Sequence, residues 1–569
     1  MRLVDARRLT GPNHITRGPL VVVELEVTPE ERQAAERLYR AELARALAAA
    51  GLPEPTGWAA REHRGGVVLG YEAPVDVMLA CTEASEWAAL SAIELAAGRP
   101  PLDLAPRLAI VRDVLARDRS PKMIALQAEA TRRGIPFLWD DERVILGMGI
   151  RSRVALRSDL PEVDEVPWER LGRIPVVMIT GTNGKTTSTR LVARMGREAG
   201  KVVGATSSDR VTIGETVIEE GDWTGPAAAR VVLGDATVEL AVLETARGGI
   251  LRRGLAVDEC DVALITNVSD DHVGGYGIDA LAAMTEVKAV VARAVPEAGV
   301  VVLSAHDPKL VALAPSLAGR VVLFADLERG DDAAREAVLA HARGGGEVVT
   351  AEGGAFVAGG AALARVDEAP ITFDGAARYN VDNILGAIAV ARALGLPTDA
   401  IRRAITGFGA ADNPRRGELV ERDGVRILLD FGHNPDGVRA LMKLVDALRA
   451  RRPGRLTVIV GSAGDRTDRD IDEVVRVVCE HRPDRVIARE LPDYLRGRVE
   501  GEVPAVFREA FARHGLEAGA FAVAASEVAA LELALVDAGH DDLVVMLVHL
   551  DAEAVRDFLR DAGDVATLQ

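Results

Sequence analysis

A short stretch near residue 180 constrains the fold of this chain more than any other. An apolar run at 176–179 leads into Gly181-Thr182-Asn183-Gly184-Lys185-Thr186-Thr187, and a helical pattern follows. Glycines let the backbone turn so that amide N–H groups converge on phosphate oxygens at the start of a helix. A lysine there reaches the β- and γ-phosphates, and the next threonine hydroxyl binds Mg²⁺. The order strand, phosphate loop, helix therefore predicts a nucleotide site, with a plain strand–turn–helix corner as the alternative.

The loop is shorter than the common phosphate loop. The usual spacing would place a first glycine at position 179, where this chain has Ile179. A phosphate-loop motor or switch is one class that such a loop could serve. No glutamine or arginine-finger arrangement typical of that class is found in the sequence. We therefore look for chemistry in the residues that follow the loop.

Length, charge and cysteine usage exclude several other classes. A chain of 569 residues predicts roughly three or four domains. Its net charge of -18 argues against a nucleic-acid-binding surface, which is expected to be basic. No signal peptide and no membrane-spanning run is recognisable. Three scattered cysteines (Cys81, Cys260, Cys479) show no metal-ligand spacing. We expect a cytoplasmic protein that binds neither nucleic acid nor membranes.

Apolar runs and chain breakers divide the sequence into three parts. Residues 1–165 mix strand and helix patterns without a catalytic constellation, which predicts a small α+β domain. A polar, acidic, proline-containing stretch at 158–167 indicates a linker. In residues 166–412, short buried runs alternate with helical patterns, and the same alternation returns in residues 413–569. Parallel sheets with helices between the strands are predicted for both.

Side chains suited to metal binding follow the strands predicted after the loop. Open parallel sheets place ligands at the carboxyl ends of their strands. Glu244 ends the strand 238–244 and could join Thr186 in holding Mg²⁺, which prefers hard oxygen ligands. The alternative is a solvated glutamate. Asn267 ends the next strand, and nearby His272 could bind a second metal through a neutral ring nitrogen, although a lone histidine is more often structural.

Lysine is rare in this chain, so each lysine is informative. Basic charge is almost all arginine, and the only lysines are Lys122, Lys185, Lys201, Lys288, Lys309 and Lys443. A lysine kept among arginines can mark chemistry that a guanidinium cannot do. Lys288 lies on the predicted helix 279–294, where Met284 and Val287 suggest an inward face. As a carbamate formed with CO₂ it would offer two anionic oxygens to metal ions; a lysine on the helix surface is an equally good interpretation.

Together these residues resemble the central domain of the Mur ligase family. The phosphate loop, Glu244, Asn267 with Asp271-His272, and Lys288 carry the resemblance. Within the family, the chain is most similar to the Mur-like half of cyanophycin synthetases, on the stretches 221–226, 244–252, 464–466 and 495–498. The likeness covers most of residues 174–550. It implies an α/β protein with a Mur ligase-like phosphate-loop domain in 166–412 and a Rossmann-like domain in 413–569.

The resemblance implies ATP-dependent amide ligation with ATP and Mg²⁺ as cofactors. A substrate carboxylate attacks the γ-phosphate, an acyl phosphate and ADP form, and an amine displaces phosphate. Metals and lysine neutralise charge in such transfers. By match, the catalytic residues are Lys185, Glu244, His272 and Lys288, and the metal ligands are Thr186, Glu244 and His272.

The nucleotide-binding set implied by the match extends beyond the loop. It comprises Gly181, Thr182, Asn183, Gly184, Lys185, Thr186, Thr187, Asn383, Arg416 and Asp430. Asn383 matches the adenine-contacting position, and Asp430 matches the ribose-binding acid. Arg416 matches an arginine that contacts the nucleotide phosphates. Its register stays open, because the family has Pro-Gly-Arg where this chain has Pro414-Arg415-Arg416.

The implied substrates are amino acids or small peptides, and aspartyl- or arginine-like chemistry is one candidate. Guanidinium groups pair well with carboxylates, so arginines near the family motifs could form an anionic-substrate pocket. Solvated surface arginine is the alternative in so arginine-rich a chain. The candidate substrate residues are Thr224, Arg247, Arg252, Arg466, Arg496 and Arg498.

The amino-terminal part also resembles that of cyanophycin synthetases, at Gly11-Pro12-Asn13, 133–136 and 146–149. In that family an ATP-grasp domain follows, whereas here the chain runs almost directly into the Mur-like part. One ATP site, and so one type of amide bond, is therefore expected. A non-catalytic nucleotide-binding subunit that serves a separate ATP-grasp enzyme is the second hypothesis, and the retained catalytic set argues against it. The resemblance also suggests a homo-oligomer.

Overall fold

The computed structural model of the chain describes residues 1–269, 276–278, 280–561 and 565–567. These residues form two compact units. The first comprises 1–325, 332–349 and 386–400, and the second comprises 326–331, 350–385 and 401–569. The first unit does not separate residues 1–165 from the phosphate-loop region, and the boundaries expected near residues 165 and 412 stay predictions. The predicted α/β architecture is confirmed.

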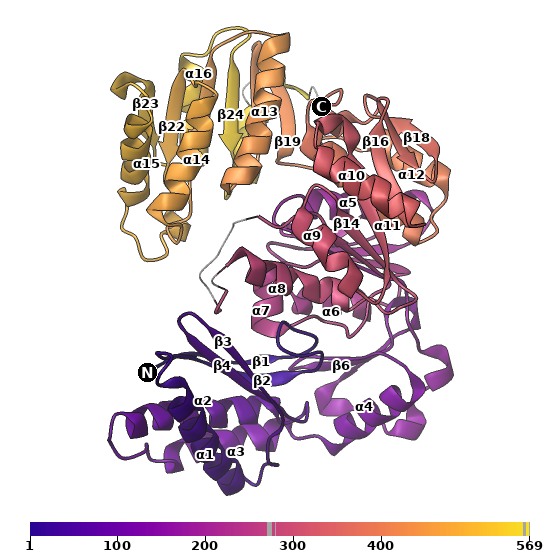
Figure 1. Cartoon of the computed structure of the whole chain (residues 1–569), viewed down its shortest axis with the longest axis vertical. Helices are drawn as coiled ribbons and strands as arrows, with labels where there is room; N and C mark the ends of the chain where they lie inside the picture. The colour runs from indigo at the N-terminus through magenta and orange to yellow at the C-terminus, as the bar shows by residue number, and fades with distance from the viewer. Residues whose placement is uncertain (270–275, 279, 562–564, 568–569) are drawn as a thin grey trace. The chain divides into compact units, whose positions relative to one another are not determined.

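An antiparallel sheet opens the first unit, with its strands in the order β1-β2-β4-β3. Successive side chains of a strand point to opposite faces. Val21, Val23 and Leu25 of β2 accordingly pack into the core under helices α1 and α2, while Leu20 and Val22 face the other side. Figure 1 shows α1, α2 and α3 gathered on one side of this sheet. A second small antiparallel sheet has the order β5-β6-β7.

The elements of this amino-terminal part have the following bounds: β1 Arg2–Leu9, β2 Leu20–Glu26, α1 Arg32–Ala50, β3 Thr56–His63, β4 Gly66–Glu72, α2 Met78–Ala96, α3 Ala105–Asp118, α4 Pro121–Arg133, β5 Phe137–Trp139, β6 Arg143–Leu146 and β7 Arg153–Leu156. Between β7 and the next strand the chain makes only short 3₁₀ turns.

The phosphate loop belongs to the large, mostly parallel sheet of the first unit. Its strand β8 is buried at every position, which explains the unbroken apolar run in the sequence. Parallel partners flank it on both sides, with Glu244 of β12 beside Ile179 and Ile265 of β13 beside Thr180. The carboxyl ends of β12 and β13 therefore lie on either side of the loop. Strand β9 pairs with the far side of β12, and β14 and β15 continue the sheet beyond β13.

The elements of this middle region have the following bounds: β8 Val176–Thr180, α5 Lys185–Glu198, β9 Val203–Thr206, β10 Arg210–Ile213, β11 Thr216–Glu220, α6 Pro226–Gly234, β12 Leu240–Glu244, α7 Arg247–Arg253, β13 Val262–Ile265, α8 Leu281–Arg293, β14 Val300–Ser304, α9 Pro308–Leu313, β15 Arg320–Asp326, α10 Asp332–Arg343, β16 Glu347–Glu352, β17 Ala355–Ala358, β18 Ala361–Arg365, α11 Arg378–Ala393 and α12 Thr398–Gly407.

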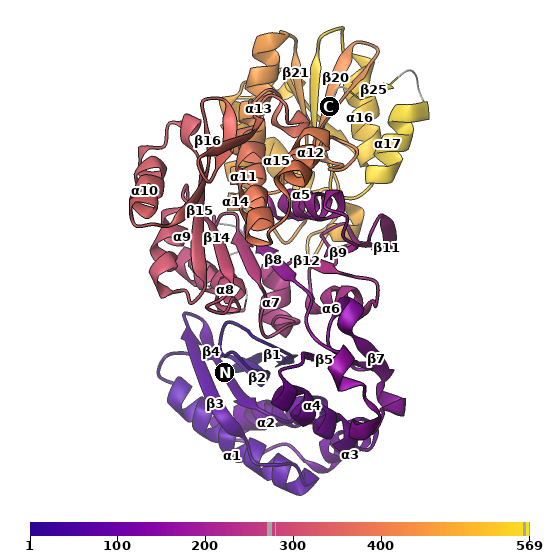
Figure 2. The same ribbon diagram turned by 90° about the vertical axis from the view of Figure 1, so that its right-hand side faces the viewer.

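The second unit is built on a sheet with the order β23-β22-β21-β24-β20-β19-β25. Five of these strands are parallel, from β23 to β20, and β19 and β25 are antiparallel additions. Helices α13, α14 and α15 pack on one face, and α16 and α17 pack on the other (Figure 2). This is the doubly covered sheet that its apolar strands predict. No described helix of the chain is long and apolar enough to span a bilayer.

The elements of the carboxyl-terminal part have the following bounds: β19 Arg416–Arg422, β20 Val425–Asp430, α13 Pro435–Arg451, β21 Leu456–Val460, α14 Asp468–Glu480, β22 Arg485–Arg489, α15 Glu502–Arg513, β23 Phe521–Ala524, α16 Glu527–Val536, β24 Leu543–Leu547, α17 Ala552–Asp561 and β25 Val565–Thr567.

Candidate active site

The phosphate loop turns from β8 into α5 through two glycines in unusual conformations. Gly181 has a φ of 154°, and a Cβ there would overlap the hydroxyl oxygen of Thr266. Gly184 takes a left-handed φ of 86° at the N-cap of α5. Only glycine meets both demands without strain. The free N–H groups of the first turn of α5 and its dipole make this a place that favours an anion.

Asn267 and Thr266, which follow β13, brace the loop from one side. The Asn183 N–H donates to Asn267 Oδ1 at 2.9 Å, and Asn267 Nδ2 donates back to the Asn183 carbonyl at 3.0 Å. The Thr266 hydroxyl donates to the same carbonyl at 2.6 Å. Both backbone groups of Asn183 are thus held by the two residues that follow β13. The sequence singled out Asn267 by its place at a strand end, and the structure gives it this bracing contact.

Two lysine amines meet at one carbonyl of the loop. Lys185 Nζ donates to the carbonyls of Gly181 and Thr182, at 3.1 and 2.9 Å. Lys288, on α8, donates from Nζ to the Gly181 carbonyl at 2.8 Å and is 4% exposed. Lys288 is therefore an inward-facing residue rather than a lysine on the helix surface. Its carbamylation stays a prediction.

Thr186 and Glu244 are joined through a residue that sequence reasoning missed. Thr186 Oγ1 lies 3.0 Å from Ser208 Oγ, and the Ser208 N–H donates to Glu244 Oε2 at 3.2 Å. Glu244 is 3% exposed. A hydroxyl and a carboxylate are the hard oxygen donors that Mg²⁺ takes, so the donor set fits this ion. Ser208 could have been found by the strand-end argument, because it follows β9, the neighbour of β12.

His272, the predicted ligand of a second metal, lies outside the residues that the structure describes. Among the side chains that are described, no three His, Cys, Asp or Glu gather as a metal site. An ion held by Thr186 and Glu244 would thus complete its ligands with phosphate oxygens and water, as Mg²⁺ commonly does.

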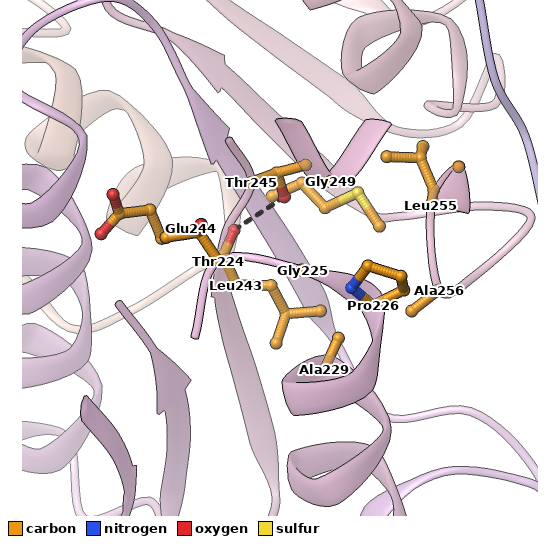
Figure 3. Close-up of a pocket in the computed structure, with 12 residues that line it drawn as sticks. Thr224, Gly225, Pro226, Ala229, Leu243, Glu244, Thr245, Gly249, Leu255 and Ala256 are labelled. Carbon is orange, nitrogen blue, oxygen red and sulfur yellow. Dashed lines mark hydrogen bonds between the residues drawn. The ribbon is translucent and has the colours of Figure 1, made fainter. Parts of the chain in front are cut away.

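A shallow, open pocket adjoins the end of β12. Thr224 and Pro226 at the start of α6 form one wall, and Leu255 and Ala256 after α7 form another. Figure 3 shows the Glu244 side chain extending away from Leu255 and Ala256. Glu244 and the adjacent Thr245 are themselves among the residues that line the pocket. Predicted substrate residue Thr224 lines this pocket.

The two predicted substrate arginines of the first unit lie on α7. Arg247 is the first residue of the helix, three positions after Glu244. Arg252 is exposed in its last turn, where Nε donates to the Tyr276 hydroxyl at 2.6 Å. Neither residue lines the pocket. The structure therefore places Arg247 and Arg252 on the same helix but not in a common pocket.

In the second unit, Arg416 and Asp430 are directly opposite each other on β19 and β20. The Arg416 guanidinium lies 4.3 Å from the centre of the Phe431 ring, and the Gly432 N–H donates to Asp430 Oδ1 at 2.8 Å. Burial raises the pKa of Asp430 to about 6. The positive charge of Arg416 and the backbone N–H groups of Gly432, Gly417 and Phe431 lower this pKa but do not outweigh the burial. Arg415 takes a left-handed φ of 59°, the conformation that a glycine adopts easily. This fits the register that aligns Pro414-Arg415-Arg416 with Pro-Gly-Arg.

Asn383 is buried on α11, in the part of this helix that belongs to the second unit. Its Nδ2 donates to Asn380 Oδ1 at 3.1 Å, and Asn380 Nδ2 donates to the Ile371 carbonyl at 2.7 Å. The amide of Asn383 is therefore held in place by a side chain one turn earlier. Its adenine contact stays a prediction.

The other three predicted substrate arginines gather in two neighbouring loops of the second unit. Arg498 Nη2 donates to the Arg466 carbonyl at 2.8 Å and pairs with Asp468 at 2.7 Å. Arg496 pairs with Asp465 at 2.7 Å. Carboxylates of this chain thus already engage Arg496 and Arg498, and a substrate anion would have to displace them.

A buried ionic network supports the loop after Asp430. Arg489 and Glu527 are 0% and 1% exposed and pair at 2.8 Å. Arg489 Nη2 also donates to His549 Nδ1 at 2.9 Å, so the proton of this imidazole resides on Nε2, which lies 3.3 Å from the Gly432 carbonyl. Burial and the adjacent guanidinium hold the pKa of His549 well below its usual value. The sequence did not predict this network, because Arg489, Glu527 and His549 each lie in an ordinary position at or near the end of a strand or helix.

The fold and the site are those of an α/β protein with a phosphate loop in its first unit and a Rossmann-like sheet in its second unit. Residues 179–391 match the Mur ligase middle domain, and residues 415–547 match the Mur ligase glutamate ligase domain. The chain therefore belongs to the Mur ligase family, as predicted.

Among its relatives are cyanophycin synthetases and cell-wall ligases. The chain is 38% identical to the cyanophycin synthetase of Synechocystis sp. over 420 residues, which are 72% of this chain and 47% of that protein. It is 26% identical to the UDP-N-acetylmuramoyl-L-alanyl-D-glutamate–2,6-diaminopimelate ligase of Gloeobacter violaceus, over 54% of this chain and 60% of the relative. The chain thus spans about half the length of the cyanophycin synthetase it matches, and the predicted likeness to the Mur-like half is confirmed.

Solved structures with a similar fold include a bifunctional folylpolyglutamate synthase/dihydrofolate synthase with Mn, AMPPNP and L-glutamate bound. It is 20% identical with a TM-score of 0.47, over 67% of this chain and 89% of that one. The predicted class of enzyme, an ATP-dependent acid–amino-acid ligase, agrees with the matched family and with the cyanophycin synthetase and cell-wall ligase relatives.

Proposed function

We propose that this protein is an ATP- and Mg²⁺-dependent ligase that activates a carboxylate as an acyl phosphate and couples it to an amine. The strongest support is the convergence of Lys185 and Lys288 on the Gly181 carbonyl, beside the Thr186–Ser208–Glu244 connection. Cations and metal-binding oxygens thus surround the mouth of a phosphate loop. This is the arrangement that phosphoryl transfer needs, because the protein mainly positions groups and neutralises charge.

In this proposal the protein residues orient the reactants. The N–H groups at the start of α5 and the Lys185 amine hold the phosphates, and Thr186 with Glu244 hold Mg²⁺. A substrate carboxylate oxygen bonds to the γ-phosphorus as the bond to the ADP oxygen breaks. The amine nitrogen then attacks the acyl carbon, phosphate leaves with its oxygen, and the amine loses a proton.

The finer assignments are part of the same proposal. Asn383, Arg416 and Asp430 contact the nucleotide, and His272 and a carbamylated Lys288 complete the metal environment. The substrates are an amino acid or small peptide and an amine, with aspartyl- and arginine-like groups as the first to test, because cyanophycin synthetase is a relative at 38% identity. The expected cytoplasmic location and homo-oligomer stay predictions.

The test is ADP release by the full chain with ATP, Mg²⁺ and pools of amino acids and dipeptides. We expect one pool to give ADP and a product whose mass equals the two substrates minus water. The Lys185→Ala variant should release none. Nucleotide binding without ADP release in any pool would contradict the proposal.

A non-catalytic subunit is the second candidate, and one observation favours it. Residues 149–175 hold only β7 and short turns, so they contain no ATP-grasp domain. A separate ATP-grasp enzyme could then be the partner. Recovery of such an enzyme in stoichiometric amount with the tagged protein, and activity only when both are present, would support this candidate.

A further inference from the structure

The amino-terminal segment 7–13 caps the carboxyl end of α7. The last carbonyls of a helix lack partners within it and carry partial negative charge. Here Arg7 Nε donates to the Leu251 carbonyl at 3.1 Å, and the Thr10 N–H donates to the Arg253 carbonyl at 2.6 Å. Arg7 is 5% exposed and also pairs with Glu24. A segment far away in the sequence thus ends this helix.

Two glycines, Gly11 and Gly254, let the backbone of segment 7–13 pack directly against the backbone that follows α7. A Cβ on Gly11 would overlap the Leu255 carbonyl, and a Cβ on Gly254 would lie 2.7 Å from the Gly11 carbonyl oxygen. Between them, the Leu255 N–H donates to the Pro12 carbonyl at 2.8 Å. The Gly11-Pro12-Asn13 sequence therefore has a physical reason at this position: only a residue without a side chain lets the two segments meet.

Asn13 fixes the turn that presents Gly11 and Pro12. It is 7% exposed, and its Nδ2 donates to the carbonyls of Gly11 and Gly18 at 3.0 and 2.9 Å. Its Oδ1 accepts the N–H groups of Ile15 and Thr16 at 2.9 and 3.0 Å. The side chain uses both donors and both acceptor positions, so the turn is rigid without help from other parts of the chain.

The capped elements are those that border the candidate active site. Helix α7 starts three residues after Glu244, and Gly249, Gly254, Leu255 and Ala256 line the pocket at the end of β12. Arg230, on the helix α6 that forms the opposite wall, donates to the Thr10 hydroxyl at 2.8 Å. Segment 7–13 therefore contacts both walls of one pocket.

We propose that residues 7–13 act as positioning residues for the pocket between α6 and α7, and so for the substrate held there. The proposal rests on the ligase function above, and it gives the amino-terminal part a role in substrate binding. Displacement of one wall by a fraction of an ångström should weaken substrate binding and leave the nucleotide loop, which is braced by Asn267, unchanged. The expected signature is a rise in KM for the carboxylate or amine substrate at a constant KM for ATP.

The test compares two pairs of variants in the full chain. Gly11→Ala pushes a methyl group into the Leu255 carbonyl, whereas Gly18→Ala, in the same turn, meets nothing within 4 Å. Thr10→Val removes the hydroxyl that Arg230 contacts and keeps its shape, whereas Thr10→Ser keeps the hydroxyl. The readouts are hydrogen exchange of peptides covering 247–256 and the KM values in the ADP-release assay.

We expect Gly11→Ala and Thr10→Val to speed exchange in 247–256 and to raise the substrate KM at least about tenfold, with the ATP KM within about twofold. Gly18→Ala and Thr10→Ser should match the unaltered protein. Unchanged exchange in both test variants, or faster exchange with an unchanged substrate KM, would overturn the proposal. Absence of ADP release by the unaltered protein would instead sink the ligase function, and the exchange data would still report whether segment 7–13 holds α7.

Discussion

Lys288 is the residue whose chemistry is most specific to a lysine. Its amine is buried and donates to the Gly181 carbonyl beside the phosphate loop. An arginine would keep the charge but cannot form a carbamate. We expect Lys288→Arg to lower kcat by about a hundredfold or more, as loss of a charge-stabilising group does. Lys443→Arg, on an exposed face of α13, is the matched control and should have no effect. ADP release measures both, and near-normal turnover in Lys288→Arg would exclude the carbamate.

Asp430 predicts a pH dependence of nucleotide affinity. Burial raises the pKa of its carboxyl to about 6, so the group loses its charge as the pH falls through 6. An ionised carboxylate accepts hydrogen bonds from ribose hydroxyls better than a protonated one does. The ratio of the ATP Kd of Asp430→Asn to that of the unaltered protein should be about tenfold at pH 7.5 and approach one near pH 5. Taking the ratio cancels titration of ATP itself. Calorimetry at several pH values measures it, and a constant ratio would contradict the ribose contact.

For single residues, the sequence predicted which side chains belong to the site better than it predicted the direction in which they point. Glu244 and Asn267 were found because strand ends carry ligands in parallel sheets. The inward direction of Lys288 could not be settled, since α8 is buried on several faces and has no single apolar stripe. Ser208 was overlooked because a serine after a strand resembles any turn residue. The left-handed φ of Arg415, which favours aligning this residue with a family glycine, is not visible in the sequence.

The turn between β8 and α5 is an element whose shape depends on one glycine. An alanine at Gly181 would overlap Thr266 Oγ1, which also holds the Asn183 carbonyl. We expect Gly181→Ala to weaken ATP binding by at least about a hundredfold, because the loop amides can no longer converge on phosphate. Gly519→Ala, with open space around its Cα, should bind ATP normally. Fluorescent-nucleotide titration measures the difference, and equal affinities would show that the loop adapts.

The network at the ends of β22 and β24 carries a stability prediction. Arg489→Met would leave the carboxylate of Glu527 buried without its guanidinium. Removing one partner of a buried ion pair costs about 3–5 kcal/mol. The exposed pair of Arg476 and Glu473 on α14 gives the control, where Arg476→Met should cost below about 1 kcal/mol. Chemical denaturation followed by circular dichroism compares the two variants, and similar costs would mean that Glu527 is satisfied by backbone amides alone.

Elements were predicted well where their apolar pattern was simple. The strand predicted at 238–244 and the helix predicted at 279–294 correspond to β12, Leu240–Glu244, and to α8, Leu281–Arg293. The sequence of strand β1, Arg-Leu-Val-Asp-Ala-Arg-Arg-Leu, carries charge on both faces and so lacks the alternation that predicts a strand. The structure explains this pattern, since Arg7 is buried against Glu24 and caps α7. A strand that lies in a polar interface does not show the alternation of a strand on a solvent surface.

For the molecule as a whole, we predict that the amino-terminal part is not dispensable. Backbone bonds cross from it to the middle region, as from Met148 to the Gly172 carbonyl and from Ile150 to the Val238 carbonyl, both at 2.9 Å. A chain that starts at residue 166 would leave these acceptors and the end of α7 without partners. Each of these hydrogen bonds contributes about 0.5–1.5 kcal/mol, and the truncation would also expose the surface that the amino-terminal part covers. The truncated chain should therefore unfold at a lower temperature and bind a hydrophobic dye, and a melting curve equal to that of the full chain would contradict this.

The turn around Asn13 has a consequence for the chemical ageing of the protein. Asparagine deamidates when the backbone nitrogen of the next residue attacks the side-chain amide, which must first swing towards that nitrogen. In Asn13 the amide is shielded from water and tied by four hydrogen bonds to Gly11, Gly18, Ile15 and Thr16. The rigidity that serves the pocket thus also protects this asparagine from hydrolysis, and keeps a new negative charge out of the contact with α7 for as long as the protein stays folded.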